Sequence, residues 1–154
     1  MNDAPASEEE TNASTLPLAG MRVIELTQAW AGPLCGMLLA DMGAEVIKVE
    51  SPGQQAEARG GSPYAGGESV IFMMTHRNKK SVTIDIKSPR GRAVFLDLVR
   101  TADALVQNLR PGALKKLGLD YDSLKKINPK LIYTSVSGYG RTGPDANKAG
   151  VDQV

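Results

Sequence analysis

The chain has 154 residues, with 18 Lys and Arg against 17 Asp and Glu, one His, one Cys and 42% apolar residues. This length is typical of one ordinary domain, and the composition is that of a globular chain rather than a disordered one. The nearly balanced charge gives no reason to expect nucleic acid as the main partner. One Cys and one His exclude an intrachain disulfide framework and a multi-cysteine or His-rich metal centre. No apolar run approaches the roughly 20 residues that span a bilayer.

The charge is unevenly distributed along the chain. Residues 1–15 carry four acidic residues and no Lys or Arg, so the excess of basic residues lies in residues 16–154. The first 15 residues are also polar and lack an apolar period, which predicts a disordered acidic tail. They have neither the basic nor the apolar region of a secretory signal peptide. We therefore expect a cytoplasmic protein in which Cys35 is a reduced thiol.

From Leu16 onward, patterns typical of strands alternate with patterns typical of helices. We expect strands over residues 21–26, 45–50, 81–87, 103–107 and 130–137. We expect helices over residues 34–42, after the Ser88-Pro89 capping pair, and over 111–117 and 122–127. The Gly-rich and polar stretches 51–70 and 138–150 are expected to be loops. This alternation predicts an α/β fold with a Rossmann-like core, in which helices flank a largely parallel sheet.

One candidate ligand site follows the first expected strand. Residues 27–33 would lie at the carboxyl end of a parallel strand and open a helix, where anions are favoured. They do not form the G-x-G-x-x-G pattern of dinucleotide sites. The alternative is that Ala31, Gly32 and Pro33 only make a tight turn, and spacing alone favours the turn.

Two further segments have a functional and a structural interpretation. Arg77, Lys79 and Lys80 are the densest basic cluster and would suit phosphate or nucleic acid, although a solvated turn is the favoured interpretation of so short a run. Asn108 and Arg110 follow another expected strand and would face a ligand, unless Asn108 is simply a helix N-cap.

Catalytic candidates are few. His76 has no partner indicated by the sequence, and Cys35 lies in an apolar helix where a buried, inert thiol is expected. Asp152 follows a glycine-rich loop and has no neighbouring acid or base. Composition and spacing therefore indicate an α/β domain with a candidate anion site and no mechanism.

Eight short segments nevertheless occur in an order that resembles a known family: residues 18–26 (LAGMRVIEL), 31–33 (AGP), 38–50 (LLADMGAEVIKVE), 78–87 (NKKSVTIDIK), 107–112 (QNLRPG), 117–121 (LGLDY), 128–133 (NPKLIY) and 137–140 (SGYG). Together they are similar to the N-terminal part of the family III CoA-transferases, the CaiB/BaiF group. That group includes formyl-CoA transferase, carnitine CoA-transferase and the α-methylacyl-CoA racemases. The resemblance implies that residues 16–154 are the N-terminal part of a CoA-binding large domain.

The resemblance also implies an activity and a set of contacts. The family moves CoA between an acyl-CoA and a free carboxylic acid, uses CoA as a substrate without a prosthetic group, and forms interlocked homodimers. The positions that correspond to its CoA contacts are Gln28, Trp30, Ala31, Ile84, Lys87, Asn108, Leu109 and Lys116, with Arg59 as a further phosphate candidate. Formyl-CoA transferase has His, Gln and Arg where this chain has Gln28, Trp30 and Ser51.

The family's catalytic nucleophile is an aspartate that carries CoA as an aspartyl-CoA thioester. By the resemblance this aspartate lies beyond Val154 and is not Asp152, so we expect the chain alone to be inactive. The racemases are the alternative within enzymes, but they carry a His at the position of Val151, which favours transferase parentage. The alternative outside catalysis is a truncated chain that binds CoA or another protein.

Overall fold

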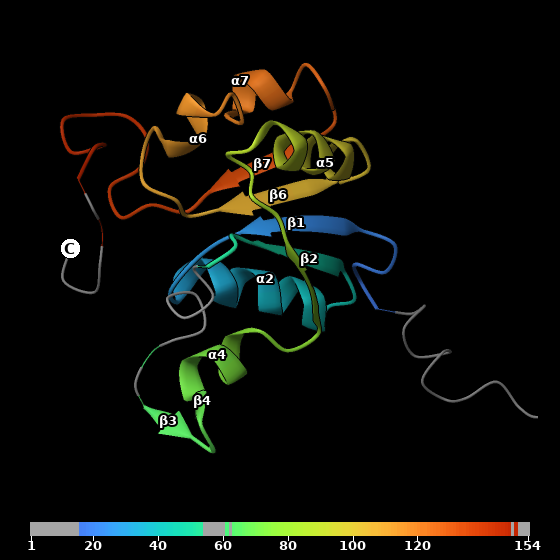
Figure 1. Cartoon of the computed structure of the whole chain (residues 1–154), viewed down its shortest axis with the longest axis vertical. Coiled ribbons are helices and arrows are strands. Elements are labelled where there is room, and N and C mark those ends of the chain that lie inside the picture. Colours follow the sequence, from blue (N-terminus) through green and yellow to red (C-terminus); the bar gives the residue numbers. More distant parts are fainter. Residues whose placement is uncertain (1–15, 54–60, 62, 149, 151–154) are drawn as a thin grey trace, which may run out of the picture.

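The computed structural model describes residues 16–53, 61, 63–148 and 150, and its centre is one parallel sheet (Figure 1). The five strands have the order β5-β2-β1-β6-β7, and every neighbouring pair is parallel. Their bounds are β1 Arg22–Leu26, β2 Glu45–Glu50, β5 Lys79–Thr83, β6 Ala104–Gln107 and β7 Ile132–Ser135. The expected α/β fold with a largely parallel sheet is therefore confirmed.

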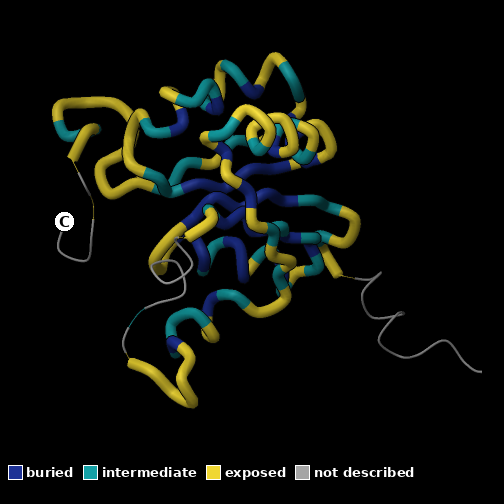
Figure 2. The backbone as a smooth tube through the Cα atoms, viewed as in Figure 1, coloured by how far each residue is buried: buried dark blue, intermediate teal, exposed yellow. Residues whose placement is uncertain are grey.

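Helices cover both faces of the sheet. Helices α2 (Ala31–Asp41) and α4 (Val70–Thr75) lie on one side, and α5 (Pro89–Arg100), α6 (Ala113–Lys116) and α7 (Tyr121–Leu124) lie on the other (Figure 1). Figure 2 shows that the buried backbone is concentrated in the central strands and the helix surfaces that face them. In the described part of the chain, no helix is long and apolar enough to cross a membrane.

Side chains that alternate along the strands pack into two separate hydrophobic cores, one on each face of the sheet. Ile24 and Leu105 point to the α5 side, where they pack with Phe95. Val23 and Val46 point to the α2 side, where the core is smaller and is built largely from alanine and valine. Both faces of the sheet are covered, as is usual for parallel sheets, and the inner strand β6 is buried along its whole length.

Most of the expected elements are present, with local differences in their bounds. The strand expected at 45–50 matches β2, and Ser88 caps α5 by accepting a hydrogen bond from the Gly91 amide at 3.1 Å. The strand expected at 81–87 is misplaced, because β5 covers Lys79–Thr83. Its bounds follow from pairing with β2, which runs from Val46 opposite Lys79 to Glu50 opposite Thr83. Ile84 and Ile86 leave the strand and enter the core.

The region expected to be a loop at 51–70 contains a small hairpin that the sequence pattern did not indicate. Strands β3 (Tyr64–Ala65) and β4 (Glu68–Ser69) pair antiparallel, and the Ser69 hydroxyl caps α4 by accepting a hydrogen bond from the Phe72 amide at 3.3 Å. Residues 54–60 and 62 lie outside the described residues, as does the expected acidic tail at residues 1–15.

Helix α2 lies so close to the sheet that one of its positions has no room for a side chain. A Cβ atom on Gly36 would sit 1.9 Å from Oε2 of Glu25, a fully buried carboxylate on β1. Glycine in a helix interior costs about 1 kcal/mol relative to alanine. Here that cost is offset because glycine lets the helix close over a buried charge.

We predict that Gly36→Ala destabilises the chain in spite of the better helix propensity of alanine. Inserting a methyl group into a packed site costs about 1–3 kcal/mol, and Glu25 is held by its own partners and has little freedom to move. Urea unfolding of both chains would measure the loss. Gly61→Ala is the matched control, because a Cβ there meets nothing nearer than 3.5 Å. Equal stability of the two variants would contradict the prediction.

Candidate ligand site at the carboxyl ends of the strands

The strand order reverses next to β1. The chain runs from β1 to β2 on one side and continues on the other side with β6 and β7. In open α/β sheets, ligands bind outside the carboxyl ends of the strands at such a switch point. The segments that leave β1 and β6 at this end are residues 27–33 and residue Asn108 onward. Both contain residues that the sequence indicated as ligand candidates.

Asn108 ties the two segments together. Its Oδ1 accepts a hydrogen bond from the backbone N–H of Gln28 at 2.8 Å, and its Nδ2 donates one to the backbone carbonyl of Gln28 at 2.8 Å. Asn108 is therefore not a helix N-cap. The residue that precedes α6 is Gly112, whose φ of 78° is in the left-handed region that favours glycine.

The segment 27–33, which we call the junction, combines an unusual backbone with close packing. Ala29 has a φ of 60°, which few residues with a side chain adopt. A Cβ on Gly32 would lie 2.6 Å from the Cβ of Thr27 and 3.0 Å from the Cγ of Asn108. The favoured interpretation of Ala31, Gly32 and Pro33 as a tight turn is wrong, because these residues form the first turn of α2 and the chain turns before them, at Ala29 and Trp30. The junction also presents the exposed side chains of Gln28 and Trp30 at the start of α2.

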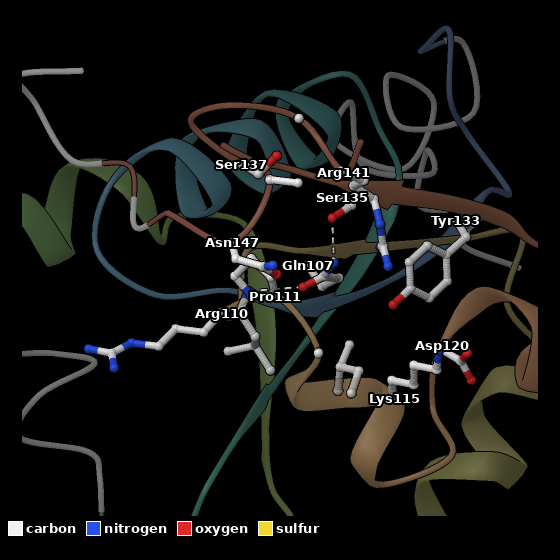
Figure 3. Close-up of a pocket in the computed structure, with 15 residues that line it drawn as sticks. Gln107, Arg110, Pro111, Lys115, Asp120, Tyr133, Ser135, Ser137, Arg141 and Asn147 are labelled. Carbon is white, nitrogen blue, oxygen red and sulfur yellow. Dashed lines mark hydrogen bonds between the residues drawn. The ribbon is translucent and has the colours of Figure 1, made fainter. Parts of the chain in front are cut away.

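A pocket of about 280 Å³ lies at the carboxyl ends of β6 and β7 (Figure 3). Gln107, the last residue of β6, donates a hydrogen bond from Nε2 to Oγ of Ser135, the last residue of β7, at 2.6 Å. Its Oε1 accepts one from the Leu109 amide at 2.9 Å. The buried Gln107 side chain therefore fixes the chain where both strands leave the sheet.

The charges around this pocket favour an anionic ligand. Arg110, Lys115 and Arg141 line it, whereas Asp120 is its one carboxylate among the described residues. The Ser123 hydroxyl donates a hydrogen bond to Asp120 at 2.5 Å and lowers the pKa of that carboxyl, so Asp120 stays ionised. With Asp120 ionised, the pocket still has an excess of positive charge, which suits phosphate or carboxylate groups.

A second, smaller crevice of about 40 Å³ lies at the carboxyl ends of β1 and β2. Gln28 and Ser51 line its mouth, and Leu109 lines both this crevice and the larger pocket. The two hollows are therefore neighbours on one edge of the sheet, with the apolar Leu109 side chain between them.

The residues indicated by the family resemblance are only partly brought together. Gln28, Asn108 and Leu109 meet at the switch point, and Trp30 and Ala31 follow at the start of α2. The side chain of Ile84 is buried in the core, and Lys87 and Lys116 are exposed and line neither hollow. Arg59, Val151 and Asp152 lie outside the described residues.

The sequence did not indicate Lys115 and Arg141 as ligand candidates. Lys115 stands next to the candidate Lys116, and Arg141 lies in the glycine-rich loop after β7. The position of that loop, at the end of an expected parallel strand, was a usable signal for Arg141.

A buried ionic cluster under the junction was also missed. Glu25 is fully buried, and its carboxylate lies 2.9 Å from Nζ of Lys48 and 2.7 Å from Nζ of Lys79, both of which are also buried. The interpretation of residues 77–80 as a solvated turn is wrong for Lys79. It fits Arg77, which lies in a turn and pairs with Asp41. Lys80 is exposed and pairs with Glu45, but it lies on strand β5 rather than in a turn. Acidic and basic residues inside apolar strands were the available signal.

Neither of the other catalytic candidates forms a catalytic arrangement. Burial, followed by the neighbouring Glu25 charge, raises the pKa of the half-buried Cys35 thiol, which keeps it protonated and unreactive. The ring of His76 stacks on Phe72, and its Nε2 is buried without a hydrogen-bond partner. In residues 16–53, 61, 63–148 and 150, no three His, Cys, Asp or Glu side chains gather as a metal site.

The chain belongs to CoA-transferase family III, because the model of that family matches residues 18–154. The chain is 45% identical over 142 residues to succinyl-CoA:glutarate CoA-transferase of Mus musculus, covering 92% of this chain and 33% of that protein. It is 44% identical to acetyl-CoA:oxalate CoA-transferase of Acetobacter aceti, covering 90% of this chain and 36% of that protein. The chain thus spans about a third of the length of these relatives.

Solved structures show the same fold. A CaiB/BaiF family protein from Brucella suis superposes with a TM-score of 0.81 at 44% identity, covering 89% of this chain and 37% of that one. A hypothetical protein from Mycobacterium tuberculosis gives a TM-score of 0.81 at 43% identity, covering 90% and 38%. The Rossmann-like core is therefore the N-terminal part of a CaiB/BaiF-type fold.

We predict that His76 makes the stability of the chain depend on pH. Burial lowers its pKa from 6.5 to about 4, so the folded chain keeps the ring neutral while the unfolded chain protonates it. The free energy of unfolding should therefore fall as the pH decreases from about 6.5 to about 4. Chemical unfolding across this range would measure the slope, and His76→Gln should show a shallower one. Identical slopes would contradict the role of His76.

Proposed function

We propose that this chain is the N-terminal CoA-binding segment of an enzyme that moves CoA from an acyl-CoA to a free carboxylic acid. The observation that carries the proposal is the cationic pocket at the carboxyl ends of β6 and β7, next to the switch point of a family III CoA-transferase fold. CoA carries several phosphate groups, which suit such a pocket. The names of the relatives, which include glutarate and oxalate, support carboxylic acids as acceptors.

The described residues would bind and orient CoA. Arg110, Lys115 and Arg141 would neutralise phosphate or carboxylate groups, and Lys87 and Lys116 would act as outer point charges. The absence of a side chain on Gly32 lets Thr27 and Asn108 pack against the first turn of α2, whose N-terminus would favour an anionic ligand. Leu109 would offer an apolar surface to the pantetheine arm between the two hollows.

The family resemblance supports a covalent route through an aspartate expected beyond Val154. Its carboxylate would attack the thioester carbonyl and expel CoA thiolate, which leaves a mixed anhydride. The thiolate would then attack the aspartyl carbonyl, releasing the donor acid and forming an aspartyl-CoA thioester. The acceptor carboxylate would repeat both steps in reverse and leave as a new acyl-CoA. The segment described here would hold CoA while the acyl groups exchange.

The resemblance also supports an interlocked homodimer in the cytoplasm for the full-length protein. An α-methylacyl-CoA racemase remains the alternative reaction. Val151, at the position where the racemases carry a His, lies outside the described residues. The relatives reported above are named as CoA-transferases, which supports transfer instead.

We predict that Lys87→Ala and Lys116→Ala each weaken CoA binding by the chain up to about fivefold, because an exposed charge pair contributes about 0.2–1 kcal/mol. Titration calorimetry with CoA would measure the dissociation constants. Lys126→Ala, an exposed lysine away from both hollows, is the control. Unchanged affinity in both variants would reject these two contacts. If Arg110→Ala alone weakened binding, the phosphates would be assigned to the pocket of Figure 3.

We further predict that the purified 154-residue chain does not transfer CoA from succinyl-CoA to glutarate, because the family's nucleophile is expected beyond Val154. Chromatography of the acyl-CoA products would measure the rate against a sample without protein. A rate above that background would show that the 154-residue chain carries its own catalytic group and would overturn the assignment of the nucleophile.

A further inference from the structure

Two buried lysines donate hydrogen bonds to the backbone at the two ends of the junction. Lys48, on β2, donates a hydrogen bond from Nζ to the carbonyl of Thr27 at 2.9 Å. Lys79, at the start of β5, donates one from Nζ to the carbonyl of Pro33 at 2.7 Å. The first and last residues of the junction are therefore held by charged groups that come from two other strands.

One carboxylate joins these two lysines. Oε1 of Glu25 accepts a hydrogen bond from Lys48 at 2.9 Å and one from the Thr27 hydroxyl at 2.6 Å. Its Oε2 lies 2.7 Å from Nζ of Lys79. The three charged side chains are no more than 3% exposed, so each has little freedom to turn toward water. The middle of the junction is also held by the two hydrogen bonds of Asn108 to Gln28.

We propose that Glu25, Lys48 and Lys79 form an ionic clamp that positions the junction for its ligand. Lys48 also lines the smaller crevice, whereas Glu25 and Lys79 line neither hollow, so Lys79 is the member that would act only through the carbonyl that it holds. Ala29, whose φ of 60° is unfavourable for alanine, lies between the two carbonyls that the clamp would hold. The role in ligand binding rests on the proposed function of the junction as part of a CoA site.

Core stability alone does not explain this ionic cluster. Buried ion pairs are often no more stabilising than apolar residues of the same shape. Here two ammonium groups share one carboxylate, so the trio carries a net positive charge. Besides pairing with Glu25, each lysine donates a hydrogen bond to a backbone carbonyl at one end of the junction. The second lysine is therefore explained by the backbone that it binds rather than by core packing.

Because two lysines pair with one carboxylate, either lysine can be replaced while Glu25 keeps a partner. Lys48→Met and Lys79→Met each leave one lysine paired with Glu25, so neither variant buries an uncompensated carboxylate. Each releases one end of the junction. Lys80→Met is the matched control, because Lys80 neighbours Lys79 on β5 and pairs with Glu45 at 2.6 Å, yet its side chain is 72% exposed.

Amide hydrogen exchange of the full 154-residue chain would measure the effect locally. The amides of Gln28 and Leu34 report on the junction, because they donate to Oδ1 of Asn108 and to the carbonyl of Trp30. The amides of β6 report on opening of the whole fold. We expect both lysine variants to raise exchange at the junction about tenfold relative to β6, and to weaken CoA binding about tenfold, with Lys80→Met unchanged in both.

A purely structural cluster would give a different result. If amide exchange at the junction and in β6 accelerated by the same factor, or if neither rate changed, the proposal of an ionic clamp would be overturned. If the unmodified chain did not bind CoA, the proposed function would fail, while the exchange ratio would still decide whether the lysines hold the junction. Faster local exchange with unchanged CoA affinity would overturn the positioning role.

Discussion

The carboxylate of Glu25 is the constraint on which much of this structure depends. A charge without exposure to water is tolerated only with close partners, and these come from β2 and β5 as Lys48 and Lys79. Helix α2 can cover it only because residue 36 is glycine. One buried charge therefore fixes how three strands and a helix come together, and its partners also bind the backbone of the junction.

The site arises because this arrangement places several chain segments at one edge of the sheet. Parallel strands bring their carboxyl ends to the same side, where one hollow lies at the ends of β6 and β7 and a smaller one at the ends of β1 and β2. Asn108 joins the loops after β1 and β6, and the loop after β7 adds Arg141. The excess of positive charge results from this convergence, since the chain as a whole is nearly neutral.

Local patterns predicted the parts of the fold that local physics decides. Strand β2 and the Ser88 cap of α5 matched because β-branched runs and capping residues act over a few neighbours. Strand β5 was misplaced because its bounds depend on pairing with β2. Lys79 was interpreted as solvated because nothing near it in sequence reveals that it faces Glu25 across the sheet.

The sequence by itself determined the alternation of strands and helices, the parallel α/β class and the membership in a family of CoA-transferases. Only the tertiary structure decided that Asn108 forms hydrogen bonds with the backbone of Gln28, 80 residues away. It also decided that Arg110, Lys115 and Arg141 line one pocket. The physical reason is that propensity and capping act between neighbours in the chain. Contacts between distant residues are set by strand order and register, which emerge when the whole sheet is assembled.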